Sequence, residues 1–123
     1  MTEPTLRGCK ILVVEDEYLL ADDIRNELAD QGATVLGPAA TLEQGLALLQ
    51  ENQPVNAAIL DVNLRGKSVF PLADELLGRN VPFVFTTGYD ASTIPDRFQQ
   101  VTRCEKPVHM AQVLQAIGRA RQS

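Results

Sequence analysis

The stretch ILVVEDE (residues 11–17) places four apolar residues in a row before three acids. An uninterrupted apolar run of this length is typical of a strand buried on both faces of a parallel sheet. Ligands bind such sheets outside the carboxyl ends of the strands, where the strand order reverses. Because Glu15 and Asp16 come directly after the run, we expect both acids to face a crevice at that edge.

Other apolar runs of the chain also end in polar residues. Asp61 follows the run 57–60, Thr86 and Thr87 follow 83–85, and Lys106 comes after a weaker run around Val101. Carboxylates gathered at one edge repel one another unless a divalent cation with oxygen ligands joins them. A lysine and a threonine hydroxyl facing that cation suit a phosphoryl group, which needs positive charge and hydrogen-bond donors. The pattern therefore predicts phosphoryl transfer to an aspartate.

Four pieces of the chain, taken together, resemble the receiver domain of two-component response regulators. In order they are ILVVEDE (11–17), AILDVNL (58–64), FTTGY (85–89) and EKPV (105–108). The stretch PFVFTTGY (82–89) is similar to the so-called FATGUY subgroup of single-domain receivers. The resemblance implies an α/β fold over residues 8–121, without an effector domain. Its core would be a doubly wound five-stranded parallel sheet of flavodoxin-like order 2-1-3-4-5, with helices on both faces.

The resemblance also implies roles for the acids. Asp61 would be the phosphoacceptor, which becomes a 4-aspartylphosphate when a histidine kinase or phosphotransfer protein donates its phosphoryl group. Glu15, Asp16 and Asp61 would hold Mg²⁺, together with the backbone carbonyl of Asn63. The protein would catalyse only its own phosphorylation and dephosphorylation, so it would not be a turnover enzyme. Its output would pass to a downstream protein by direct binding.

Residues that transmit the signal match the family less completely. Lys106 matches the phosphate-contacting lysine and Thr87 matches the switch hydroxyl, although Thr86 is an alternative for the inward hydroxyl. Receivers usually carry Tyr or Phe three residues before the lysine, where this chain has Arg103. An arginine in that apolar slot would bury its charge, which is costly unless the charge is paired. Tyr89 either replaces the missing ring or only covers the mouth of the site.

Apolar spacing predicts helices between the strands. We expect a helix from about residue 18 to 31, a second that opens with the capping-box pattern 41–44, and a third over about 69–77. The last helix carries the stripe Met110, Val113, Leu114 and Ile117. Between residues 88 and 100 apolar positions are few and Pro95 removes a backbone donor, so the fourth helix should be short or irregular.

Several competing interpretations are weaker. Glu15 and Asp16 could stabilise the dipole of the next helix, but this role leaves Asp61 and Lys106 unexplained. A flavodoxin would carry a Ser/Thr/Gly-rich phosphate loop where this chain has Glu-Asp-Glu. A haloacid dehalogenase-type phosphatase would place an Asp-x-Asp motif there. A receiver-fold interaction module that is never phosphorylated would typically lack one of the acids or the lysine, and it remains the alternative function.

Length and composition limit the number of domains, the possible partners and the cellular setting. A chain of 123 residues fits one domain with its own core. Its net charge of −5 argues against direct binding of nucleic acid, which requires a basic surface. No apolar run approaches the length of a membrane span, so we expect no membrane insertion. Cys9 and Cys104 fall at the start of the first expected strand and the end of the fifth, so we expect no disulfide between them, and they favour a reduced, cytoplasmic setting.

Overall fold

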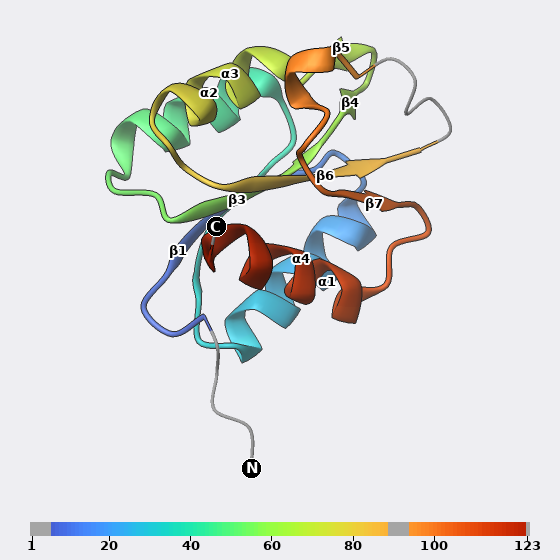
Figure 1. Cartoon of the computed structure of the whole chain (residues 1–123). Coiled ribbons are helices and arrows are strands. Elements are labelled where there is room, and N and C mark those ends of the chain that lie inside the picture. The colour runs from blue at the N-terminus through green and yellow to red at the C-terminus, as the bar shows by residue number, and fades with distance from the viewer. Residues whose placement is uncertain (1–5, 89–93, 123) are drawn as a thin grey trace.

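The computed structural model describes residues 6–88 and 94–122, which form a parallel sheet between two layers of helices (Figure 1). The strands of this five-stranded sheet are β1 (Lys10–Val14), β2 (Thr34–Ala39), β3 (Ala57–Asp61), β6 (Phe83–Thr87) and β7 (Arg103–Glu105). They lie in the order β2-β1-β3-β6-β7 and pair in parallel throughout. Counted in chain order, this is the flavodoxin-like order 2-1-3-4-5, and the predicted fold class is confirmed.

Each face of the sheet is covered by its own pair of helices. The helices are α1 (Tyr18–Asp30), α2 (Leu42–Glu51), α3 (Phe70–Gly78) and α4 (Met110–Gln122). In Figure 1, α2 and α3 lie above the sheet and α1 and α4 lie below it. No helix of the described ranges is long and apolar enough to cross a membrane.

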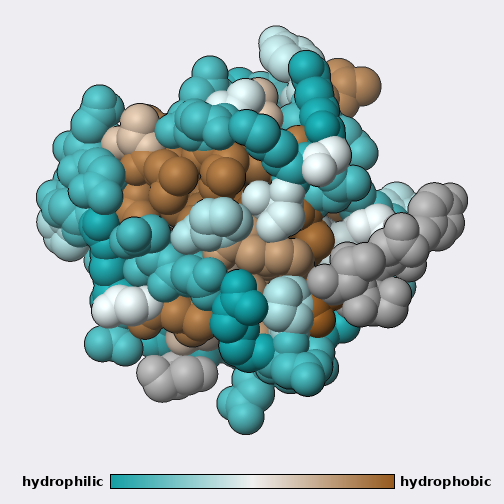
Figure 2. All heavy atoms as spheres, turned by 90° about the horizontal axis from the view of Figure 1, so that it is seen from above, coloured by the Kyte–Doolittle hydropathy of each residue, from teal (hydrophilic) through white to brown (hydrophobic). Residues whose placement is uncertain are grey.

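The apolar run after Lys10 is uninterrupted because β1 serves two cores. Leu12 and Val14 pack into the cluster under α2 and α3, whereas Ile11 and Val13 pack into the cluster with α1 and α4. Successive side chains of a strand point to opposite faces, so a strand covered on both sides must be apolar at every position. Figure 2 shows the outer side of α2 and α3, where apolar side chains remain visible between polar ones.

The predicted capping pattern closes the start of α2. Thr41 is the N-cap, and its Oγ1 accepts a hydrogen bond from the Gln44 backbone N–H at 3.1 Å. The side chain of Gln44 accepts from the Ala40 N–H at 2.9 Å, one residue before the cap itself. Two backbone donors at this helix end are thereby satisfied within the chain.

The fifth strand of the sheet lies later than the apolar run around Val101 predicts. Val101 is half-buried in a turn, where its N–H donates to the Phe98 carbonyl at 3.0 Å. The ladder to β6 is formed instead by residues 103–105. This strand lies at the edge of the sheet and pairs through its backbone, so its side chains need not be apolar and give little sequence signal.

A small hairpin that the sequence analysis did not predict follows Asp61. Its strands are β4 (Asn63–Leu64) and β5 (Lys67–Ser68), joined by Arg65 and Gly66. Both joining residues have positive φ, 52° and 87° respectively. Two-residue hairpin loops with positive φ at both positions usually carry Asn-Gly or Asp-Gly, and the Arg-Gly pair hides the signal.

The segment before β7 contains one short turn of helix in its described part. The 3-10 helix η2 (Asp96–Phe98) follows Pro95, so the expectation of a short or irregular fourth helix holds for residues 94–100. Arg97 forms a two-pronged ion pair with Asp74 of α3, with distances of 2.8 and 3.0 Å. The ring of Phe98 is fully buried beside Phe85. These contacts anchor η2 to α3.

Gly45 of α2 generates a stability prediction. A Cβ at this position would lie 2.9 Å from Leu72 Cδ2 and 3.1 Å from Val14 Cγ2, both in the packed core. Gly118 of α4 has open space around the same position. Alanine gains about 1 kcal/mol over glycine inside a helix, whereas overpacking costs about 1–3 kcal/mol. Gly118→Ala should therefore stabilise the protein, and Gly45→Ala should be less stable than Gly118→Ala by about 1–3 kcal/mol.

Urea denaturation of both variants beside the wild type measures this difference. Equal stabilisation by the two alanines would show that α2 does not depend on the close approach at Gly45.

Candidate functional site

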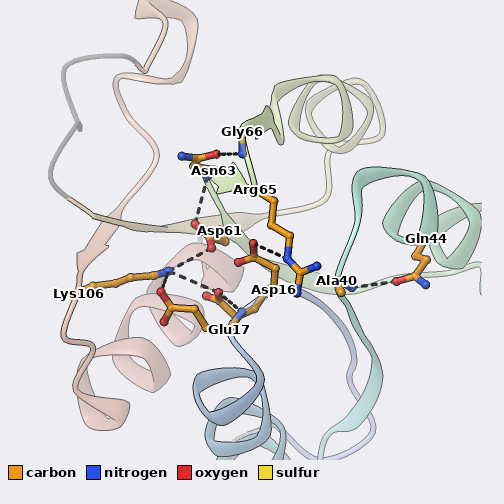
Figure 3. A network of polar contacts seen from close by, with 10 residues as sticks. Asp16, Glu17, Ala40, Gln44, Asp61, Asn63, Arg65, Gly66 and Lys106 are labelled. Carbon is orange, nitrogen blue, oxygen red and sulfur yellow. Dashed lines mark hydrogen bonds and ion pairs between the residues drawn. The ribbon is translucent and has the colours of Figure 1, made fainter.

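The carboxyl ends of four strands meet at one edge of the sheet. The pairing of Val14 with Leu60, of Asp61 with Thr86 and of Thr87 with Glu105 brings these ends side by side. Figure 3 shows the polar side chains that follow the strand ends and point toward one another from separate segments. The topology thus assembles residues that are up to 91 positions apart in the sequence.

Three carboxylates form the floor of the site. One oxygen each from Glu15, Asp16 and Asp61 lies within 4.8 Å of the others. Glu15 and Asp61 are only 2% and 3% exposed, whereas Asp16 is half-buried. Oxygen ligands with this much negative charge match the preference of Mg²⁺. All three acids that the resemblance assigns to the metal are therefore close enough to share one ion.

Lys106 bridges carboxylates of this site through hydrogen bonds from its ammonium group. Its Nζ donates to Asp61 Oδ2 at 3.1 Å, to Glu17 Oε1 at 3.2 Å and to Glu15 Oε2 at 3.4 Å (Figure 3). The Lys106 backbone N–H donates to the Thr87 carbonyl at 2.8 Å, which fixes the lysine beside β6. An ammonium group has three protons, so these bonds use all of its donors.

Burial shapes the protonation of this cluster. Burial, together with the contact with the Asp61 carboxyl, raises the pKa of Glu15 to about 8. Burial also raises the pKa of Asp61, although Lys106 opposes the rise. Burial lowers the pKa of Lys106, but the carboxylates of Glu15 and Asp61 outweigh this effect and raise it overall. In the absence of a divalent ion, the site is thus suited to keep a proton near neutral pH. A bound divalent ion would displace that proton.

The two threonines at the end of β6 have different surroundings. Thr86 Oγ1 donates to Glu15 Oε1 at 3.4 Å, so this hydroxyl supports the acid cluster. Thr87 Oγ1 is buried and has no hydrogen-bond partner among the described residues. A buried hydroxyl without a partner costs roughly 1–3 kcal/mol. Thr87 therefore has a free donor, which Thr86 lacks.

The hairpin after Asp61 forms the opposite wall of an open pocket of about 1300 Å³. The Asn63 N–H donates to Asp61 Oδ1 at 3.2 Å, and the Asn63 side chain accepts from the Gly66 N–H at 2.8 Å. Arg65 at the tip lies with its Nε 3.7 Å from Asp16 Oδ2 and is largely exposed. The hairpin is thus tied to Asp61, and Arg65 brings a second cation to the mouth of the pocket.

Two residues of the site were missed in the sequence, Glu17 and Arg65. Glu17 is the third acid of ILVVEDE, and an acid at a helix start is commonly a surface residue, so only the contact with Lys106 reveals it. Arg65 became a neighbour of Asp16 through the unpredicted hairpin.

The residues proposed for signal transmission are only partly described. Arg103 is half-buried in β7, opposite Phe85 in the register, so its charge is not fully removed from water. Tyr89 lies outside the described residues. The choice of Thr87 over Thr86 as the switch hydroxyl stays a prediction, with the unpaired hydroxyl of Thr87 in its favour.

Known structures similar to this chain include SdrG. A solution structure of SdrG from Sphingomonas melonis Fr1 is 36% identical, covers 95% of this chain and 98% of its own, and has a TM-score of 0.76. The BeF3-activated conformation of SdrG from Pseudomonas melonis Fr1 is 37% identical, with coverage of 94% and 98% and a TM-score of 0.71. No family model matches the chain.

Proteins named PhyR are similar as well. The solution NMR structure of the Erythrobacter litoralis PhyR response regulator REC domain is 26% identical, covers 93% of this chain and 90% of its own, and has a TM-score of 0.81. The curated Phyllosphere-induced regulator PhyR of Methylorubrum extorquens is 30% identical over 119 residues, or 90% of this chain. The chain spans 43% of the length of that relative.

The raised pKa of Glu15 predicts a pH-dependent stability in the absence of divalent ions. Its folded value of about 8 exceeds the ordinary value of 4.5, so the folded state keeps a proton that the unfolded state releases. Stability should therefore fall as the pH rises from about 4.5 to about 8. Asp61, whose pKa is also raised, acts in the same direction.

Urea denaturation in EDTA at several pH values checks this, with Glu15→Gln expected to flatten the dependence. Glu51→Gln removes an acid from an exposed position of α2 and should behave as the wild type. An equally steep loss of stability in Glu15→Gln would show that the proton is held elsewhere.

Proposed function

The chain belongs to the receiver-domain family of response regulators, and from this we propose that it accepts a phosphoryl group on Asp61 and signals by binding another protein. The donor is the phosphohistidine of a histidine kinase or of a phosphotransfer protein. The observation that carries the proposal is the hydrogen bond of 3.1 Å between Lys106 Nζ and Asp61 Oδ2, made beside a buried acid cluster. A cation already lies where the charge of a phosphoryl group on Asp61 would develop.

In the proposed reaction, a carboxylate oxygen of Asp61 attacks the phosphorus. The new O–P bond forms as the N–P bond to the donor imidazole breaks, and the product is an acyl phosphate. Lys106 binds one phosphoryl oxygen and stabilises its charge, as preorganised donors do in other phosphoryl transfers. Glu15, Asp16, Asp61 and the Asn63 carbonyl would hold Mg²⁺, which when bound supplies charge neutralisation for the incoming oxygens.

Thr87 is the residue that we propose to sense the phosphoryl group. Its buried hydroxyl lacks a partner among the described residues, so a bond to a phosphoryl oxygen would satisfy it without breaking another one. The conformation with this bond would gain population when Asp61 is modified. The chain would thus act as a self-modifying switch and not as a turnover enzyme.

The setting of this switch is also part of the proposal. Residues 8–121 form one receiver domain whose output passes by protein contact to a downstream target. Cys9 and Cys104 are both free and buried, which suits the reducing cytoplasm. SdrG is named in a BeF3-activated conformation, and beryllofluoride mimics an acyl phosphate, so a relative at 37% identity supports a phosphorylated active state here.

Substitution of the acceptor tests the proposal. The wild type, incubated with acetyl phosphate and Mg²⁺, should give a slower band on a phosphate-affinity gel, and Asp61→Asn should give none because the amide cannot form the acyl phosphate. Asp30→Asn, at the exposed end of α1, should be labelled as the wild type is. Labelling that persists in Asp61→Asn would reject Asp61 as the acceptor and direct attention to Asp16.

A further inference from the structure

Glu17 is placed to act on Lys106 instead of on its own helix. It is the N-cap residue of α1, yet its side chain makes no capping hydrogen bond. The Glu17 N–H donates to Glu15 Oε2 at 3.0 Å, so the buried acid fixes the backbone at this point. The free carboxylate instead accepts from Lys106 Nζ at 3.2 Å, with 59% of the Glu17 side chain exposed.

The three bonds of Lys106 leave no proton for a fourth acceptor. Its ammonium donates to Glu15, Glu17 and Asp61 at 3.1–3.4 Å. An ammonium has three protons, so a phosphoryl oxygen on Asp61 can bind Lys106 only when one of these bonds is released. A phosphoryl oxygen and the carboxylates that accept from Lys106 in the resting state therefore compete for the same three donors.

Glu17 is the partner that is released at the lowest cost. The side chain of Glu15 is 1% exposed, so no water can replace the lysine there. Asp61 carries the phosphoryl group itself, and its contact with Lys106 becomes a contact with the new oxygens. The exposed carboxylate of Glu17 can exchange the lysine for water. If it stayed, its negative charge would face a phosphoryl group of the same sign.

We propose that Glu17 is a positioning residue that restrains Lys106 in the unphosphorylated state and thereby slows phosphorylation of Asp61. This inference rests on the proposed function, because it concerns the regulation of the same site. Glu17 occupies one of the three donors of Lys106, which an incoming phosphoryl oxygen needs, and its charge adds repulsion as that oxygen arrives. The contact thus slows phosphorylation of Asp61, and a neutral residue at this position would make it faster.

Glu17→Gln keeps the size of the side chain and removes its charge. With acetyl phosphate at saturating Mg²⁺, its rate of phosphorylation should be about twofold to fivefold that of the wild type, as expected for a partly exposed ion pair. Asp23→Asn makes the same charge change at an exposed position of the same helix and should keep the wild-type rate. Saturating Mg²⁺ removes any effect of the lost charge on metal affinity.

A second readout needs neither metal nor phosphate. In the unmodified protein, the NMR resonances of the Lys106 side chain should shift in Glu17→Gln and stay unchanged in Asp23→Asn. A purely structural role for Glu17 would lower the stability without raising the rate.

The outcomes separate the two proposals. If the wild type is never labelled, the proposed function is wrong and this inference falls with it. If the wild type is labelled and Glu17→Gln is labelled at the same rate or more slowly, only the restraint by Glu17 is wrong. Unchanged Lys106 resonances in Glu17→Gln would also overturn the restraint, because the lysine would then not depend on this partner.

Discussion

The ion pair between Lys106 and the buried carboxylates of Glu15 and Asp61 is the constraint on which the rest of the site depends. Two acids with at most 3% exposure cannot both be charged without a cation at hand. The ammonium group lies 3.1 and 3.4 Å from them and meets this need in part. The remaining negative charge, to which Asp16 contributes, is what makes the pocket suited to a divalent ion and then to a phosphoryl group.

The fold supplies this constraint through its two cores. A parallel sheet covered on both faces has strands that are apolar along most of their length, so the polar side chains appear at the last positions of the strands or beyond them. Those ends coincide at one edge, where Glu15 follows β1, Asp61 ends the adjacent β3, and Lys106 follows β7, which is separated from β3 by β6. Two interactions outside the sheet hold the surrounding loops: Lys67 pairs with Glu43 at 2.9 Å, and Arg97 pairs with Asp74 at 2.8 Å. The sheet topology therefore brings the charges together in the absence of any ligand.

The sequence predicts the parts of this arrangement that follow from buried strands, and it misses those that follow from loops. The run before Glu15 predicted β1 because burial on both faces requires four apolar residues together. The edge strand β7 was predicted too early in the chain, because it pairs through its backbone and its side chains give little signal. The apolar signal comes from Val101, which packs against the core without belonging to the strand. The role of Glu17 was hidden, because an exposed acid looks the same in a sequence whether or not a lysine 89 residues away reaches it.

Titration of Mg²⁺ into the unmodified protein, followed by backbone amide NMR, tests most directly whether the acid cluster at this edge of the sheet binds a divalent cation. The shifts should be confined to residues 15–17, 61–63 and 106, which surround the acid cluster. Asp16→Asn removes the half-buried ligand and should weaken binding by about tenfold or more. Shifts spread over the acidic surface, or wild-type affinity in Asp16→Asn, would contradict the assignment of the cluster as a metal-dependent phosphoacceptor site.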